Sequence, residues 1–205
     1  MDKKGFLIVI SGFSGVGKGT VVKRLVSDYG YSLSVSATTR APREGEVDGR
    51  EYYFKSREEF MNLIDYNGFI EWAVYVENYY GTPRAFVEQE LALGHHVILE
   101  IEVQGALNIK RQYPDAVLIF LTAPSAAELK NRLMGRGTEE AAVVEKRMRR
   151  AVEEAEDMDQ YEYIIVNDDL DQCVKDVNSV IVARGCMIEE KKEFMDQMKA
   201  ELKAL

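Results

Sequence analysis

The chain has 205 residues, of which 46% are apolar, and a formal net charge of −9. This length predicts one domain, with or without inserted lobes, that is large enough to bury a core. The acidic balance argues against a general nucleic-acid-binding protein, which would be basic, and no apolar run reaches the ~20 residues that a membrane-spanning helix needs.

A glycine-rich loop directly follows the first predicted strand, the apolar run over residues 6–10. The pattern Gly-x-x-x-x-Gly-Lys fits residues 12–18, and a helix is predicted to begin at about Thr20. Glycines let successive backbone N–H groups surround an anion, the helix N-terminus adds positive potential, and Lys18 adds a mobile charge. We therefore expect a polyphosphate site here, the alternative being an ordinary glycine-rich turn that binds nothing.

The residues of this loop form one predicted binding set: Gly12, Phe13, Ser14, Gly15, Val16, Gly17, Lys18, Gly19 and Thr20. One position departs from the usual pattern. Gly19 stands where a serine or threonine hydroxyl normally holds Mg²⁺, and Thr20 follows one place later.

Short apolar strands alternate with helices along the rest of the chain. Strands are predicted over residues 32–37, 51–54, 69–76, 97–102, 116–121 and 161–166. Helices are predicted over residues 57–66, 83–94, 104–111, 126–134, 139–158, 169–184 and 187–204. Continuous apolar strands separated by helices indicate an α/β fold with a parallel sheet covered on both faces. Segment 32–86 departs from this alternation of apolar strands and helices, because its strands are short and aromatic. It predicts a small, partly antiparallel lobe inserted into the core.

Helix boundaries can be predicted from capping residues. Ser56 and Glu59 form a capping box, and Ser125 and Glu128 form a second one. Thr82 is expected to cap the helix that Pro83 opens.

The last helix carries an apolar stripe of Phe194, Met198 and Leu202, spaced four residues apart, with Leu205 three residues further on. We expect this stripe to pack against the core, with partner binding as the alternative. The two cysteines, Cys173 and Cys186, lack metal-ligand spacing; they and the N-terminus, which shows no signal peptide, predict a cytoplasmic protein.

A second informative stretch lies between residues 36 and 54. Arg40 and Arg43 lie three residues apart around Pro42, and their planar guanidinium groups could grip one phosphate. Tyr52 could add a hydroxyl. The alternative is that both arginines are solvated loop charges.

Glu71 is the single acid among the aromatic and apolar residues 69–73. A carboxylate in such a setting suits guanine, which presents adjacent N1–H and N2–H donors, whereas adenine offers no such pair. The alternative is an ordinary surface acid.

Segments 36–46, 69–73, 78–82, 135–138 and 166–170 together make the chain resemble the guanylate kinases, which are P-loop phosphotransferases. The resemblance implies a three-layer core of about residues 1–35, 87–125 and 160–205. It also implies a GMP-binding lobe of about residues 36–86 and a lid of about residues 126–159.

The resemblance further implies roles for individual side chains. The GMP phosphate would be held by Arg40, Arg43, Tyr52 and Tyr80. The base would be read by Ser36, Glu71 and Thr82. Glu100 and Glu102 stand where the family typically has aspartate; one would serve Mg²⁺ through water and the other would face GMP. Asn167 would lie near the adenine of ATP.

The lid is expected to supply Arg132, Arg136 and Arg147, which with Lys18 and Arg40 make up the predicted catalytic set. Arg132 and Arg136 are also expected to bind ATP. The other charges of residues 139–154, Arg149 and Arg150 included, are expected to form a solvated helix face.

The expected reaction is transfer of the γ-phosphate of ATP to GMP, and to dGMP as well. Mg²⁺ would be held largely through water and phosphates, with a small contribution from Thr20. The expected partners are these small molecules and neither nucleic acid nor membrane, in a monomer or homodimer. Two alternatives stay open: a kinase for another acceptor such as AMP or UMP, and a non-catalytic scaffold that keeps the fold.

Overall fold

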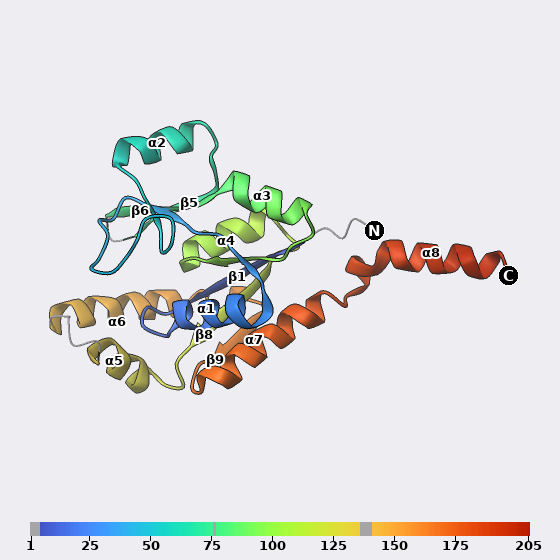
Figure 1. Ribbon diagram of the computed structural model, residues 1–205. Coiled ribbons are helices and arrows are strands. Elements are labelled where there is room, and N and C mark those ends of the chain that lie inside the picture. Colours follow the sequence, from blue (N-terminus) through green and yellow to red (C-terminus); the bar gives the residue numbers. More distant parts are fainter. Residues whose placement is uncertain (1–4, 76, 136–140) are drawn as a thin grey trace.

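The computed structural model describes residues 5–75, 77–135 and 141–205. Its core is a five-stranded parallel sheet (Figure 1). In spatial order the strands are β2 (Ser32–Leu33), β7 (Val97–Glu100), β1 (Leu7–Gly12), β8 (Val117–Thr122) and β9 (Tyr163–Val166). Every residue of β1 is buried, which confirms the predicted buried strand in front of the glycine-rich loop.

Helices cover both faces of this sheet, as the run of apolar strands predicted. Ile8 and Ile10 of β1 pack against α1 (Lys18–Tyr29) and α7 (Leu170–Arg184). Leu7 and Val9 point to the other face, where the cover comes from α3 (Arg84–Ala92), α4 (Val103–Gln112), α5 (Ala126–Met134) and α6 (Ala141–Ala155). Strand side chains alternate between the two faces, so one strand supplies both halves of the core.

A second sheet has four strands in the order β4 (Tyr53–Phe54), β3 (Ala37–Thr38), β6 (Asn78–Pro83) and β5 (Phe69–Tyr75). Its β3–β4 pair is parallel and its other pairs are antiparallel, which confirms the predicted lobe. Phe60 of α2 (Arg57–Asp65) packs on Phe69 and Ala37 in a separate small core. The capping box of Ser56 and Glu59 that starts α2 is present in both directions.

Three details of the lobe differ from the predictions. The predicted strand 32–37 is two strands in two different sheets, because the chain leaves the core sheet after Leu33 and enters the lobe at Ala37. Strand β6 was not predicted. Thr82 belongs to this strand and does not cap α3, because its hydroxyl donates to Glu71; Pro83 occupies the N-cap position instead.

Two further boundaries also differ. The predicted strand 97–102 ends at Glu100, and Glu102 is the N-cap residue of α4. Ser125 caps α5 by accepting from the amide of Glu128, whereas the Glu128 side chain pairs with Arg132 and does not reach back to complete a box.

The C-terminal segment continues from α7 through the 3₁₀ turn η2 (Ile188–Lys191) into α8 (Lys192–Lys203). Figure 1 shows α8, in red, extending away from the rest of the molecule. The prediction that its apolar stripe packs in the core was wrong, because Phe194, Met198 and Leu202 are all exposed. None of the helices among the described residues is long and apolar enough to cross a membrane.

Candidate active site

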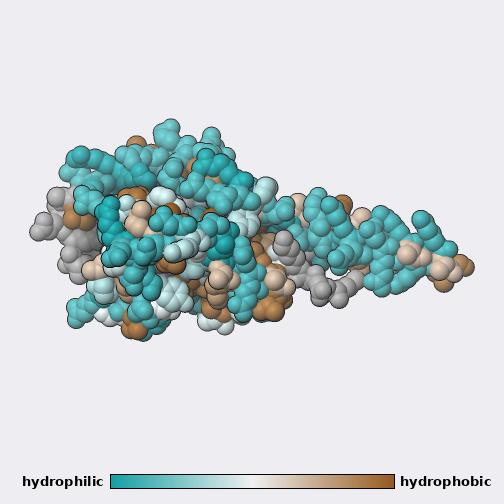
Figure 2. Space-filling model, turned by 90° about the horizontal axis from the view of Figure 1, so that it is seen from above, coloured by the Kyte–Doolittle hydropathy of each residue, from teal (hydrophilic) through white to brown (hydrophobic). Residues whose placement is uncertain are grey.

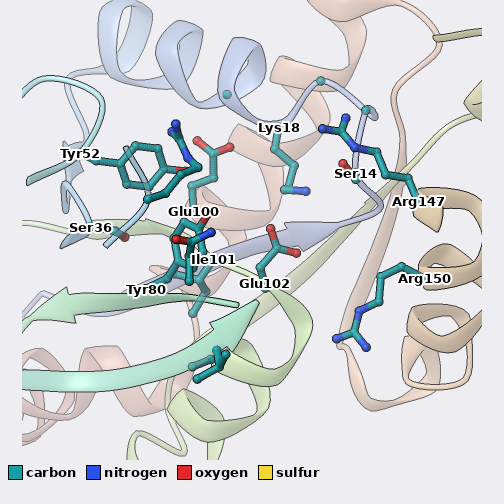
Figure 3. A pocket seen from close by; sticks show the side chains of 18 of the residues that line it. Ser14, Lys18, Ser36, Tyr52, Tyr80, Glu100, Ile101, Glu102, Arg147 and Arg150 are labelled. Atoms are coloured by element: carbon teal, nitrogen blue, oxygen red, sulfur yellow. The ribbon is translucent and has the colours of Figure 1, made fainter. Parts of the chain in front are cut away.

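A cavity of about 900 Å³ lies where the core, the lobe and α6 meet (Figure 3). It brings together predicted residues from distant parts of the chain. Those lining it are Ser14, Gly15, Gly17, Lys18, Gly19, Thr20, Ser36, Arg40, Arg43, Tyr52, Glu71, Tyr80, Glu100, Glu102 and Arg147. The cavity lies beyond the carboxyl ends of β1 and β7, the usual ligand position in an open parallel sheet.

The glycine-rich loop has the backbone geometry that an anion site needs. Gly12, Gly15 and Gly17 all have positive φ, and a Cβ at Gly12 would lie 2.1 Å from the carbonyl oxygen of Leu121. Lys18 begins α1, and its Nζ donates to the carbonyls of Gly12 at 2.7 Å and Phe13 at 3.2 Å. The lysine therefore lies over the loop, at the helix end where backbone N–H groups have no intrahelical acceptors.

Two residues of the predicted loop set face the core rather than the cavity. Phe13 is buried and packs edge-on against Phe120, and Val16 is fully buried. Both residues can contribute to anion binding only through their backbone.

The environment of Gly19 suits a hydrated divalent cation. A Cβ on Gly19 would lie 3.5 Å from Oε1 of Glu100, so this carboxylate lies directly beside the start of α1. Burial raises the pKa of Glu100, an effect that the charge of Lys18 opposes and that Glu102 adds to. Carboxylate, hydroxyl and phosphate oxygens are the ligands that Mg²⁺ prefers. Glu100, with Thr20 at the same cavity wall, therefore fits a Mg²⁺ that keeps most of its waters.

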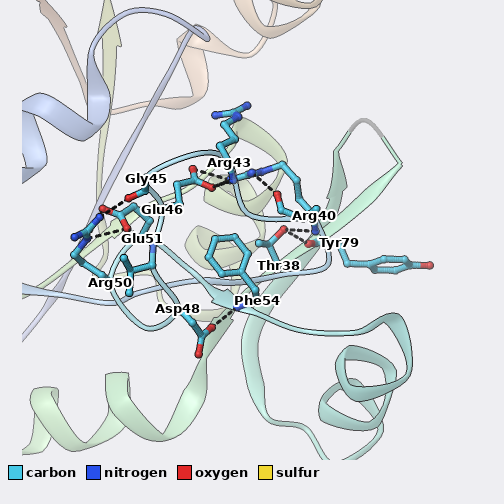
Figure 4. Close-up of polar contacts among 12 residues, drawn as sticks. Thr38, Arg40, Arg43, Gly45, Glu46, Asp48, Arg50, Glu51, Phe54 and Tyr79 are labelled. Atoms are coloured by element: carbon cyan, nitrogen blue, oxygen red, sulfur yellow. Dashed lines mark hydrogen bonds and ion pairs between the residues drawn. The ribbon is translucent and has the colours of Figure 1, made fainter.

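Arg40 is held rigidly rather than solvated (Figure 4). Its Nη2 donates to both carboxylate oxygens of Glu46 at 2.9 Å, and its Nη1 donates to the carbonyl of Ala41 at 2.7 Å. Its guanidinium lies 5.4 Å from the ring centroid of Tyr52. The side chain is only 15% exposed, so the alternative of a solvated loop charge is wrong for Arg40. Glu46 also accepts from the backbone N–H of Arg43, which ties the whole loop to one carboxylate.

Arg43 differs from Arg40 in that it is exposed. It still lines the cavity, and Figure 4 shows its guanidinium directed away from Glu46. Tyr52 and Tyr80 complete this wall, with ring centroids 6.0 Å apart. Burial and the nearby Glu100 raise the pKa of Tyr52 to about 12, so its hydroxyl keeps its proton and can donate to an anion.

Glu71 is buried at the lobe end of the cavity. Its Oε1 accepts from the hydroxyl of Thr82 at 2.7 Å. Burial raises the pKa of Glu71 to about 7, and the hydrogen bonds from Thr82 only partly oppose this. Thr82 is fully buried behind Glu71, so it orients the carboxylate and does not line the cavity.

The sequence analysis missed Gly105 on α4. A Cβ there would lie 2.7 Å from Oε2 of Glu71, so any other residue would displace this carboxylate from its observed position. A glycine inside a helix was the available signal, because glycine is unfavourable there without a packing reason.

A second hollow, of about 480 Å³, opens on the other side of the glycine-rich loop. Gly15, Gly17, Arg132 and Asn167 line it. Asn167 is buried and its Nδ2 donates to the carbonyl of Val16 at 2.8 Å, while Arg132 donates to the carbonyl of Asn167 at 2.7 Å. Arg132 and Asn167 are thus brought to the loop as predicted, but to a neighbouring hollow. Arg136 lies outside the described residues.

The predictions for the arginines of α6 were only partly correct. Figure 3 shows Arg147 extending from α6 towards Ser14 and Lys18, and Arg150 leaving the same helix one turn later. The prediction that Arg150 is simply solvated was wrong, because it lines the cavity and pairs with the buried Glu154 at 3.4 Å. Burial and the nearby Glu102 raise the pKa of Glu154 to about 7, against the lowering effects of Lys18 and Arg150. The spacing of residues 147, 150 and 154 places them on one helix face, and this was the signal available in the sequence.

The comparisons with known proteins agree with this geometry. Residues 4–184 match the family model described as guanylate kinase. The chain is 46% identical to the guanylate kinase of Caldanaerobacter subterraneus subsp. tengcongensis, covering 98% of each chain. It is 52% identical to that of Streptococcus thermophilus, over 92% of this chain and 91% of the relative.

The solved structures give the same answer. The crystal structure of guanylate kinase from Anaplasma phagocytophilum superimposes with a TM-score of 0.78 at 31% identity, covering 91% of this chain and 89% of the other. The glycine-rich loop, the buried Glu71 and the arginine-bearing loop are thus set in a chain that belongs to the guanylate kinase family.

Proposed function

We propose that ATP and GMP meet end to end in the 900 Å³ cavity, with their phosphates between the glycine-rich loop and the loop that carries Arg40. As a guanylate kinase, the protein transfers the γ-phosphate of ATP to GMP and releases ADP and GDP. Individual residues have separate roles in this reaction.

The donor nucleotide is assigned to the core. The backbone of residues 12–20 and Lys18 would hold its β- and γ-phosphates, and Arg132 and Asn167 would line the path of its adenosine. Arg147 would reach the transferring group from α6, and Arg136, on the same predicted lid, would do so as well. An arginine side chain placed there offsets the negative charge on the equatorial oxygens of the transferring group in the transition state.

The acceptor nucleotide is assigned to the lobe. Arg40, Arg43, Tyr52 and Tyr80 would hold the phosphate of GMP. Glu71, backed by Thr82, would accept from N1–H and N2–H of guanine, and Ser36 would add a hydroxyl beside it. An ionised carboxylate can only accept, so adenine, which offers one donor at N6 beside the acceptor N1, would leave one carboxylate oxygen facing an acceptor.

Mg²⁺ would bind between the donor phosphates and Glu100, largely through water, with Thr20 nearby. When bound it would supply positive charge that offsets the charge of the donor phosphates. Glu102, which borders Lys18 in Figure 3, would face the reacting phosphates without binding the base. The attacking oxygen of GMP is already anionic near neutral pH, so alignment and countercharge are the main contributions of the protein.

We further propose that residues 36–86 and 126–159 move as the lobe and the lid against the remaining core. Closure would bring Arg147 onto the phosphates and exclude water. Two free cysteines, Cys173 and Cys186, support a reducing, cytoplasmic setting.

The observation that carries the proposal is the buried Glu71 facing the same cavity as Lys18. The test is ADP release from ATP and Mg²⁺ with GMP, dGMP, AMP or UMP as acceptor. Turnover that depends on GMP or dGMP supports the proposal. Preference for AMP or UMP would contradict the assignment of Glu71, and absence of acceptor-dependent turnover would support a scaffold.

A further inference from the structure

One ion pair on α6 lies beside the cavity without a role in the proposed reaction. Arg150 lines the cavity, and Glu154, one helical turn later, is only 2% exposed. The Nε of Arg150 lies 3.4 Å from Oε1 of Glu154, and its Nη1 donates to Glu153 at 2.7 Å. On the same helix, the paired side chains of Arg149 and Glu145 are 75% and 67% exposed. The pair of Arg150 and Glu154 is therefore not a solvated pair of this ordinary kind.

Burying Glu154 is costly for the fold. α6 packs on the core through Val144 and Ala151, and Glu154 continues this buried face. Among the described residues, no hydrogen bond of ordinary geometry reaches either oxygen of its carboxylate. Burial and the nearby Glu102 raise the pKa of this carboxyl to about 7, because its charged form is destabilised there. A buried acid kept at such a cost is typical of a functional position.

Arg150 and Arg147 reach different parts of the cavity. Figure 3 shows Arg147 extending towards Ser14 and Lys18, whereas the guanidinium of Arg150 lies beyond Glu102, on the side of the lobe strands. Residues of β5 and β6 line the same cavity, so α6 faces the lobe across it. Arg147 is therefore directed to the donor phosphates, and Arg150 to the space that the acceptor nucleotide would fill.

The core, the lobe and α6 form the walls of this space. No residue of the C-terminal arm, which consists of η2 and α8, is among those that line the cavity, and Figure 2 shows this arm projecting from the body. Arg40 and Arg43 approach the acceptor phosphate from the lobe, and Lys18 lies on the core side. A further cation that meets this phosphate from the third wall has to come from α6.

We propose that Arg150 contacts the phosphate of GMP from α6, and that Glu154 is the positioning residue that holds its guanidinium in the cavity. This inference rests on the proposed placement of GMP against the lobe. An arginine fork matches two phosphate oxygens, and it opposes the repulsion between the phosphates of the two nucleotides. Because Glu154 belongs to the same helix, the pair moves as a unit when α6 approaches the lobe, and the guanidinium arrives already oriented.

Coupled ADP release at pH 8, with GMP varied at saturating ATP, tests the role of Arg150. Arg150→Gln should lower kcat/KM for GMP about 10–100-fold, mainly through KM, with the KM for ATP within about twofold of the wild type. Arg150→Lys keeps the charge but not the fork, so it should recover only part of this loss. Arg24→Gln is the matched control, because Arg24 also pairs with an acid four residues later on a helix, Asp28, but does not line the cavity.

Glu154→Gln tests the positioning role. It keeps the size of the side chain and removes the charge that orients Arg150, so kcat/KM for GMP should fall about three- to tenfold. The same variant should resist urea better than the wild type at pH 8, whereas a purely structural residue would not lose activity while the protein gains stability. The double variant with Arg150→Gln should be no less active than Arg150→Gln alone, because Glu154 acts through Arg150.

Wild-type kcat/KM for GMP in Arg150→Gln would overturn the proposal. A loss confined to kcat, or shared equally by GMP and ATP, would overturn the assignment of Arg150 to the acceptor. Independent, multiplicative losses in the double variant would overturn the role of Glu154. A wild-type protein that does not phosphorylate GMP would contradict the proposed function itself, so the two failures are distinguishable.

Discussion

Glu71→Gln isolates the group that we expect to select guanine. In the wild-type protein Glu71 is 6% exposed and Thr82 orients one of its oxygens, which leaves the carboxylate to accept from a ligand. Glutamine keeps the size and one acceptor, but it presents an NH₂ group where guanine offers an N–H. Two hydrogen bonds to a charged acceptor, at about 1.5–3 kcal/mol each, are weakened or lost.

The expected cost is therefore about 3–5 kcal/mol, or roughly 10²–10⁴-fold in kcat/KM for GMP. The KM for ATP should change less than about twofold, because ATP is assigned to the other end of the cavity. The assay is coupled ADP release with GMP varied at saturating ATP, and then the reverse. Glu88→Gln is the matched control, because Glu88 is an exposed acid that pairs with Arg84. Equal losses for GMP and ATP, or no loss for GMP, would refute the reasoning.

The raised pKa of Glu71 adds a pH dependence to the same test. Guanine binding needs the ionised carboxylate, and the pKa of Glu71 in the unliganded protein is about 7. The KM for GMP in the wild type should rise as the pH falls from 8 to 6, approaching about tenfold per unit once the group is mostly protonated. GMP's own phosphate titrates near this range, so the wild-type to Glu71→Gln ratio is the quantity to compare. A ratio that does not vary with pH would contradict the assignment.

Three further predictions address the phosphate loop, the lid helix and the lobe. Lys18→Ala should lower kcat by at least about 10²-fold with a folded protein by circular dichroism, and an unaffected kcat would remove Lys18 from the catalytic set. Glu154→Gln should stabilise the unliganded protein. Glu154 is a buried acid whose pKa is about 7 in the folded protein, so the wild-type free energy of unfolding falls as the pH rises from 4.5 through 7. The gain should reach up to about 3 kcal/mol at pH 8 and be absent at pH 4, as measured by urea unfolding, and a gain confined to low pH would contradict the sign. Ser56→Ala should destabilise the lobe by about 1 kcal/mol in thermal unfolding, and an unchanged midpoint would show that the capping box adds nothing.

The parts of the fold that sequence reasoning predicted best are those with local causes. The loop around Lys18 is defined by glycines that adopt positive φ in the structure, and Ser56 and Glu59 start α2 through contacts three residues apart. The apolar runs of β1 and β8 predicted a parallel core because strands buried on both faces must be apolar throughout.

The parts that sequence reasoning missed depend on distant segments. Whether residues 32–37 form one strand or two is decided by β7 on one side and β6 on the other. Threonine is a residue type that often caps helices, but the hydroxyl of Thr82 donates instead to Glu71, 11 residues earlier. Gly105 matters only because α4 approaches the Glu71 side chain of β5 there. The stripe on α8 has the spacing of a core helix, and nothing local shows that the chain carries it away from the body.

A crystal structure with GMP and a non-hydrolysable ATP analogue tests the central claim most directly. We expect the guanine to donate to Glu71, the GMP phosphate to contact Arg40 and Arg43, and the γ-phosphate to lie at Lys18 in line with the acceptor oxygen. A guanine bound away from Glu71, or a GMP phosphate that neither arginine touches, would contradict the account.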